Sequence, residues 1–70
     1  MEIDSLDAYK CQLHTRCIQI ESHDFHFDKK SAERDAKNCY KNYLKVVGRT
    51  ETDDGYRIFS TTFTKIVIKK

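Results

Sequence analysis

The sequence has no proline and no tryptophan, only two glycines among its 70 residues, and no long apolar segment. Without a run of about 18 apolar residues, no transmembrane helix and no membrane partner are expected. The first residues contain no apolar stretch of the kind that a secretory signal requires. No proline- or glycine-rich linker divides the chain, so we expect a single small domain over residues 1–70.

The number of cysteines, the net charge and the chain length do not indicate a particular function. Three cysteines cannot all pair within one chain, so we expect reduced thiols and a cytoplasmic protein. Thirteen basic against 11 acidic side chains leave a net charge that does not by itself indicate a partner. Seventy residues lie near the lower limit for a self-sufficient core. Such a chain has little room for an enclosed catalytic cleft, and a homodimer would bury more apolar surface.

Alternating apolar side chains predict β-structure over residues 8–21, after a short polar arm at residues 1–7. The apolar side chains occupy odd positions as far as Leu13 and even positions from Ile18. Either one long strand carries a bulge near Arg16, or a hairpin turns at that point and places Leu13 opposite Ile18. We favour the bulged strand because Thr-Arg is a poor two-residue turn.

The clearest expected element is a helix over residues 28–47, preceded by alternating strand positions at Phe25 and Phe27. Asp28 is a good N-cap, and Gly48 suits the left-handed conformation that ends many helices. Apolar side chains recur at three- and four-residue steps, as on the buried face of a helix. They are Ala32, Ala36, Cys39, Tyr40, Tyr43, Leu44 and Val47.

Strand-forming residues return after the helix. The Asp-Asp-Gly sequence ending at Gly55 is a turn signal, so we expect a hairpin joining residues 49–52 to a segment that begins at Tyr56. Residues 56–69 form either one long strand or two segments with a further turn near Ser60 and Thr61. The element order is then strand, strand, helix, strand, strand. The expected fold is α+β, a small antiparallel sheet with one amphipathic helix packed on one face. Nothing in the chain covers the other face, so it is either solvated or in contact with another molecule.

Cysteine and histidine are the residues most able to carry metal or nucleophilic chemistry. Cys11, His14 and Cys17 are spaced three apart, but strand geometry points such positions to opposite faces, and no glycine turn accompanies them. Cys39 lies on the apolar helix face, where a buried thiol is inert by default. The sequence contains no phosphate-binding loop and no serine elbow. We expect no metal, no cofactor and no enzymatic activity.

The outer face of the expected helix carries a continuous row of cations. At about 100° per residue, they fall within a stripe roughly 80° wide and about 22 Å long. The stripe consists of Lys30, Arg34, Lys37, Lys41 and Lys45. Such a row can follow phosphates or contact an acidic protein surface, and a solvated lysine-rich face is the alternative.

The start of this helix, residues 28–36 (DKKSAERDA), resembles the last helix of double-stranded-RNA-binding domains. In that family a Lys-Lys pair at the N-terminus of this helix contacts phosphates across a groove. The resemblance implies the same contact for Lys29 and Lys30. The family has a helix before its strands and ends with this helix, whereas here residues 49–70 follow it, so we assign no family.

These observations favour recognition through surface contacts. We expect a small non-enzymatic binding protein that docks on a larger protein and modulates or inhibits it, by analogy with short accessory proteins of phages and mobile elements. The contact would use the sheet edge, an aromatic sheet face or the basic stripe. Nucleic-acid binding through the stripe is the alternative. Secondary contacts are expected from Lys29, Tyr56, Phe63, Lys65 and Lys69.

Overall fold

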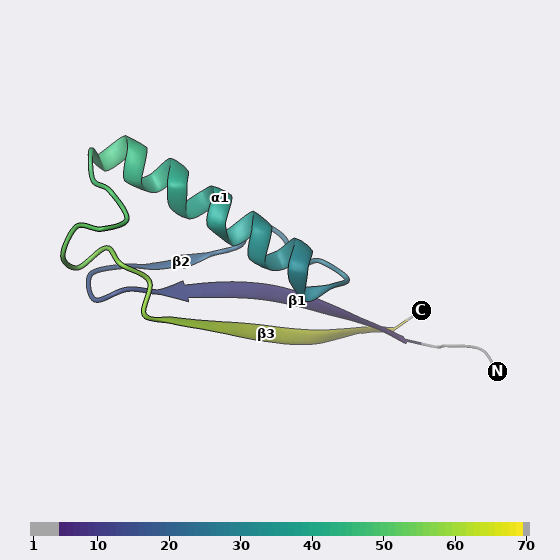
Figure 1. Ribbon diagram of the computed structural model, residues 1–70. Coiled ribbons are helices and arrows are strands. Elements are labelled where there is room, and N and C mark those ends of the chain that lie inside the picture. Colours follow the sequence, from purple (N-terminus) through teal and green to yellow (C-terminus); the bar gives the residue numbers. More distant parts are fainter. Residues whose placement is uncertain (1–4, 70) are drawn as a thin grey trace.

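The computed structural model describes residues 5–69, which form three strands and one helix (Figure 1). The strands are β1 (Ser5–His14), β2 (Gln19–Glu21) and β3 (Ser60–Lys69), and the helix is α1 (Lys29–Val47). Both β2 and β3 are antiparallel to β1, so the sheet order is β2-β1-β3. The helix lies on one face of this sheet, which confirms the α+β class.

The molecule is elongated, with principal extents of 50 × 18 × 14 Å. β1 and β3 pair along their whole lengths, and the end of this pair near the chain termini projects past the start of α1 (Figure 1). We call residues 5–8 and 66–69, which form this end, the terminal ribbon. Residues 5–7 therefore belong to β1 and not to a polar arm, because β3 supplies the ladder partners for them. The rest of the predicted arm, residues 1–4, lies outside the described residues.

The predicted bulged strand over residues 8–21 is wrong, because the chain reverses between β1 and β2. Arg16 and Cys17 occupy the centre of the turn. Thr15 closes it: the Thr15 N–H donates to the carbonyl of Ile18 at 3.0 Å, and Oγ1 accepts from the N–H of Ile18 at 2.9 Å. The threonine hydroxyl thus stands in for a backbone acceptor, which stabilises a turn that contains no glycine.

The hairpin alternative has the right topology but a different register. Its turn lies one residue later than predicted, so Leu13 is opposite Ile20 instead of Ile18. Moving the turn by one residue shifts the pairing by two, which matches the two-residue period of a strand. The apolar side chains of both strands therefore remain on one face.

The strand predicted around residues 25–27 reduces to a single bridge between Tyr9 and His26. Ser22 accounts for the interruption. Its Oγ, in place of a backbone carbonyl, accepts a hydrogen bond from the Cys11 N–H at 3.1 Å, while the Ser22 N–H donates to the Cys11 carbonyl at 2.8 Å. Because a side-chain oxygen takes the place of a backbone carbonyl here, the regular hydrogen-bond ladder between β1 and β2 ends at this point.

The helix occupies the predicted segment and has the predicted caps. Asp28 accepts from the Ser31 N–H at 2.9 Å, and Gly48 has a φ of +71°. Cys11 and Leu13 of β1 pack against its buried face and complete the core. The buried residues of α1 are Ala32, Ala36, Tyr40 and Leu44. The other three residues predicted to face inward are less covered: Cys39 and Tyr43 are half-buried and Val47 is exposed.

Residues 49–59 form a loop of turns, and the predicted hairpin with a strand on each side of Asp53 is wrong. The carboxylate of Asp53 accepts from the Thr50 N–H at 2.7 Å, and its backbone bonds to Thr50 and Tyr56 at 3.1 Å each. These groups are used inside the loop, so they cannot support a strand. Gly55 has the positive φ that the turn signal predicted, at +88°. The element order is therefore strand, strand, helix, strand.

The described chain contains no helix that is both long and apolar enough to cross a membrane.

Candidate binding surfaces

The sheet face opposite α1 carries an apolar patch. Directly opposed residues of antiparallel strands share a face, and the register pairs Leu6 with Ile68 and Ala8 with Ile66. Cys11, at an odd position, lies on the other face in the core, so these four even-numbered residues face away from the helix. Leu6, Ile66 and Ile68 are 37%, 38% and 40% exposed. We call Leu6, Ala8, Ile66 and Ile68 the open-face patch.

Ala8 shows that the side chains of the open-face patch are close together. It is only 1% exposed, although no helix covers its face of the sheet. Larger side chains of the same face must therefore close over it. Phe25 also belongs to this face, because the Nζ of Lys10 lies 5.2 Å from its ring centroid and Lys10 occupies an even position of β1. The exposed apolar surface thus extends to both sides of β1.

The other half of the open face is polar and internally satisfied. Gln12 is buried, and its Nε2 donates to the Oγ1 of Thr64 at 2.7 Å while its Oε1 accepts from Thr62 at 3.2 Å. The Nε2 of His14 lies 2.7 Å from the same Thr62 hydroxyl. These bonds fix the register of β1 against β3 and leave few polar groups free to bind a ligand.

The outer edge of β3 has no partner strand among residues 5–69. Every residue from Thr61 to Lys69 is exposed, and the pairing with β1 continues over ten residues without a bulge. An unpaired edge of this length presents a row of N–H and C=O groups that can pair with another chain. This edge was expected from the sequence only in general terms, because the strand order was not predicted.

All five cations of the basic stripe lie at exposed positions of α1. The Nζ of Lys37 lies 3.8 Å from the Glu33 carboxylate, which offsets part of its charge. Within residues 5–69, no ion pair involves the other four. They are Lys30, Arg34, Lys41 and Lys45. The helix therefore displays a cationic row on the side away from the sheet.

The Lys-Lys pair at the helix start is divided between two environments. Lys29 faces the sheet, and its Nζ lies 5.6 Å from the ring centroids of both Tyr9 and Phe63. Lys30 belongs to the exposed stripe. The structure thus gives Lys29 an intramolecular cation–π role at the strand-facing end of the helix.

The remaining secondary residues do not form one surface with the stripe. Phe63, Lys65 and Lys69 occupy odd positions of β3 and lie on its helix-side face. Tyr56 is half-buried in the loop, where its carbonyl accepts from the Tyr40 hydroxyl at 2.6 Å. The guanidinium of Arg49 lies 5.8 Å from the Tyr56 ring. Tyr56 therefore anchors the loop to the core and is half-buried, and its role as a secondary contact stays a prediction.

A half-buried cluster brings together one histidine, one aspartate and one cysteine. The Nε2 of His26 lies 2.7 Å from the Asp35 carboxylate, and the Cys39 thiol donates to the other oxygen of Asp35 at 3.6 Å. The bond to His26 lowers the pKa of Asp35 to about 2. Burial, and then the charge of Asp35, raise the pKa of Cys39. A protonated thiol that donates to a carboxylate is a poor nucleophile.

The cysteines predicted to be reduced are all free. Burial raises the pKa of the Cys11 thiol in the core, whereas Cys17 is exposed at the turn. In the part of the chain that the structure describes, no three His, Cys, Asp or Glu side chains are grouped so that they could hold a metal ion. The three-residue spacing of cysteine and histidine in the sequence therefore does not bring ligands together.

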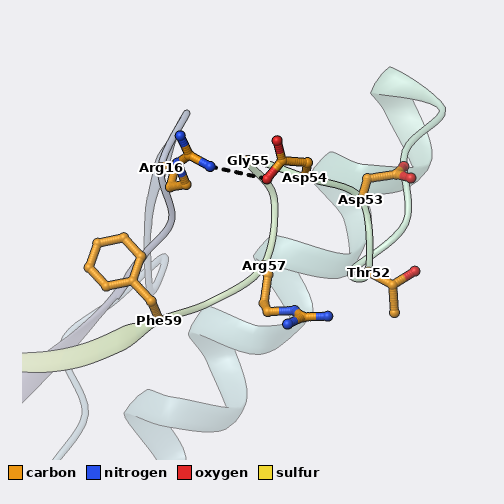
Figure 2. Close-up of a pocket in the computed structure, with 7 residues that line it drawn as sticks. All are labelled: Arg16, Thr52, Asp53, Asp54, Gly55, Arg57 and Phe59. Atoms are coloured by element: carbon orange, nitrogen blue, oxygen red, sulfur yellow. Dashed lines mark hydrogen bonds and ion pairs between the residues drawn. The ribbon is translucent and has the colours of Figure 1, made fainter.

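Figure 2 shows a recess between the β1–β2 turn and the loop of residues 49–59. Arg16 donates to Asp54 at 3.2 Å across it, and Arg57 and Phe59 lie on its wall. Asp53 adds a second carboxylate. Two arginines and two aspartates balance one another, so the recess has no net charge to attract an ion.

The open-face patch was not predicted from the sequence. The alternation at Ile66 and Ile68 was visible, but Leu6 was assigned to a polar arm, and only the pairing of distant segments places it beside them.

No protein-family model, curated protein or solved structure matches the chain.

Proposed function

We propose that this protein is a non-enzymatic binding module that docks on a larger protein through the open-face patch. The observation that carries the proposal is the exposure of aligned Leu6, Ile66 and Ile68 on a sheet face without a helix. Contiguous exposed apolar side chains on a small protein are typical of interaction sites. Docking would modulate or inhibit the larger protein by blocking one of its surfaces or by selecting one of its conformations.

The placement of the reactive side chains supports a binding role in preference to catalysis. Cys11 is in the core, and Cys39 donates to a carboxylate instead of facing a base. His14 and His26 are each engaged with a neighbouring side chain at 2.7 Å. These contacts stabilise the fold, and the free thiols fit a reducing compartment such as the cytoplasm.

The test compares two faces of one strand. Ile66→Lys places a charge in the open-face patch, while Val67→Lys places it on the opposite face of β3 at a residue that is 52% exposed. Each tagged variant is used to capture proteins from the native host, with and without nuclease, and bound proteins are quantified by mass spectrometry. We expect a protein that is captured by wild type and by Val67→Lys, is lost with Ile66→Lys, and resists nuclease. Capture of the same proteins by all three baits, or of none, would overturn the proposal.

Nucleic-acid binding through the basic stripe is a second candidate, favoured by the four stripe cations that have no ion pair among the described residues. If four phosphates are contacted, affinity for a duplex should fall roughly 100-fold between 50 and 200 mM salt. Arg34→Gln with Lys41→Gln should then reduce the salt slope by about two. Lys65→Gln with Lys69→Gln, which removes the same charge from β3, is the control. Fluorescence anisotropy with labelled RNA and DNA duplexes measures both, and equal effects of the two double variants would contradict binding through the stripe.

A further inference from the structure

The unpaired edge of β3 presents backbone groups in a defined alternation. The odd-numbered residues of β1 direct their N–H and C=O groups toward the side of the sheet that holds β2. The Cys11 carbonyl accepts from the Ser22 N–H, and the N–H and carbonyl of Tyr9 both bond to the backbone of His26. The even residues of β1 therefore bond toward β3, and the register gives them even partners, such as Ile66 for Ala8. The odd residues of β3 must point their N–H and C=O groups to the free edge. They are Thr61, Phe63, Lys65, Val67 and Lys69.

This edge has few of the features that prevent strand addition. It has no proline, its residues are mostly β-branched, and its pairing with β1 shows no bulge. Lys65 and Lys69 are its only charged residues among those described. A charged edge of this kind opposes indiscriminate pairing but permits a register in which the lysines do not meet.

We propose that β3 pairs antiparallel with β3 of a second copy, with Thr64 opposite Thr64 on the two-fold axis. A two-fold axis perpendicular to the sheet joins two antiparallel edge strands into one sheet and leaves both helices on the same face. The proposal concerns the edge of β3 and is independent of docking through the open-face patch.

Charge decides between the two registers with the longest overlap. Centring the pair on Lys65 would place this lysine opposite its own copy, and like charges directly opposite are destabilising. Centring it on Thr64 pairs residues 60–68 of both copies and places Lys65 opposite Phe63 of the second copy. In this arrangement the odd residues of one copy, whose N–H and C=O groups point outward, lie opposite odd residues of the second copy, so the hydrogen-bond ladder can form.

The same register covers side chains that are exposed in the single chain. Ile66 comes opposite Thr62 of the second copy, and Val67 comes opposite Thr61. Phe63, 36% exposed, gains the aliphatic stem of Lys65 across the axis. The paired sheet has six strands, and the open-face patches lie on its common helix-free face.

The first experiment measures molar mass by light scattering after size-exclusion chromatography, over a concentration series. We expect a shift from 8.3 kDa toward twice that mass as concentration rises. Lys65→Pro should abolish the shift, because residue 65 has an outward N–H that β1 does not use, and proline is tolerated at such edge positions. Lys65→Ala, which removes the charge but keeps the N–H, should retain the dimer. A wild-type monomer at every concentration, a dimer that survives Lys65→Pro, or open-ended assembly would each overturn the proposal.

The second experiment tests the register and does not require the proline variant to fold. In a Cys17→Ser background, Thr64→Cys should form an intermolecular disulfide on mild oxidation. A pair that is not hydrogen-bonded has Cα atoms about 4.5 Å apart, within disulfide range. Thr62→Cys and Ile66→Cys, on the same face, are the controls and should cross-link far less when introduced singly. Equal cross-linking at all three positions, or a preference for Lys65→Cys, would overturn the register. Ile66→Lys leaves the predicted ladder intact, so loss of docking and loss of dimer are separable results.

Discussion

At the scale of single residues, Ser22 controls how β2 ends. It is 2% exposed, and its hydroxyl accepts from the Cys11 N–H at 3.1 Å and donates to the Asp24 carbonyl at 3.0 Å. A backbone N–H in the core thus depends on a side chain for its partner. This arrangement lets the chain leave the ladder after β2 without an unsatisfied buried donor.

Ser22→Ala should therefore destabilise the protein by about 1–3 kcal/mol, because the buried N–H of Cys11 loses its acceptor. Ser31→Ala is the matched control, since it removes an exposed hydroxyl bond to Asp28 while the backbone cap remains. Its effect should be within about 0.5 kcal/mol. Urea denaturation followed by circular dichroism measures both. Equal midpoints for the two variants would show that the Ser22 bond is dispensable.

Asp35 makes the stability of the fold depend on pH at the acid end. Its pKa is lowered from 3.8 to about 2, first by the bond to His26 and then by backbone N–H donors. A lowered pKa in the folded state means that the contribution is complete above pH 3.8 and is lost as the pH falls through about 2. For a carboxylate that is 17% exposed, the contribution should be of order 1–2 kcal/mol.

In Asp35→Asn, the free energy of unfolding should decrease less than in wild type as the pH falls from 3.8 to about 2, because the amide does not take up a proton in this range. Asp54→Asn, at a carboxylate that is 92% exposed, is the control and should keep the wild-type decline. Urea unfolding at a series of pH values measures the slopes. A wild-type slope that Asp35→Asn leaves unchanged would assign the acid sensitivity to other carboxylates.

At the scale of elements, the loop of residues 49–59 is fastened to the β1–β2 turn. The Cys17 N–H donates to the Gly55 carbonyl at 3.0 Å, and a Cβ at position 55 would lie 2.5 Å from the Cys17 sulfur. Gly55 also has a φ of +88°. The glycine permits the positive φ, and an added Cβ would have to displace the sulfur of Cys17, which lies in a turn distant in sequence.

Gly55→Ala should cost about 1–2 kcal/mol, because the positive-φ strain adds to the displacement of the Cys17 sulfur. Gly48→Ala has a positive φ but nothing within 4 Å of the added Cβ, so it should cost only about 1 kcal/mol. Adding Cys17→Ala to Gly55→Ala should recover part of the loss by removing the clashing sulfur. Thermal unfolding of the single and double variants checks this, and strict additivity would exclude the contact as the cause.

At the scale of the whole molecule, the sheet has a covered half and an uncovered half. The core joins α1 to the middle of β1, while β3 is exposed from Thr61 to Lys69. The unpaired edge and the open-face patch are consequences of this arrangement. A chain with so small a core gains most by burying further surface against another molecule.

Hydrogen exchange should reveal the state of the β3 edge directly. In the single chain, the even amides of β3 bond to β1 and should be protected, whereas the odd amides should exchange rapidly. Raising the protein concentration should also protect the odd amides from Thr61 to Val67 if two copies pair as proposed, whereas Lys69 lies outside the paired residues and should stay unprotected. Exchange measured by NMR at low and high concentration checks the alternation. Uniform protection along β3 at low concentration would contradict the register of the monomer.

Local sequence signals were sufficient to predict the helix, its caps and the α+β class. Asp28, Gly48 and the three- and four-residue spacing of apolar residues act within one segment, so their effects are local. The Gly55 turn was also predictable, because a turn signal requires only a few neighbouring residues. The stripe on α1 followed from helical geometry alone.

The strand order, the register of β1 with β2 and the open-face patch could not be predicted, because they depend on long-range packing. Each depends on segments far apart in the chain, such as Leu6 with Ile68, or on a side chain that replaces a backbone bond, as Thr15 and Ser22 do. Strand pairing is non-local, since either edge of β1 could accept several partners with similar alternation. In the observed fold, α1 covers Cys11 and Leu13 of β1, and β3 lies at the edge of the sheet.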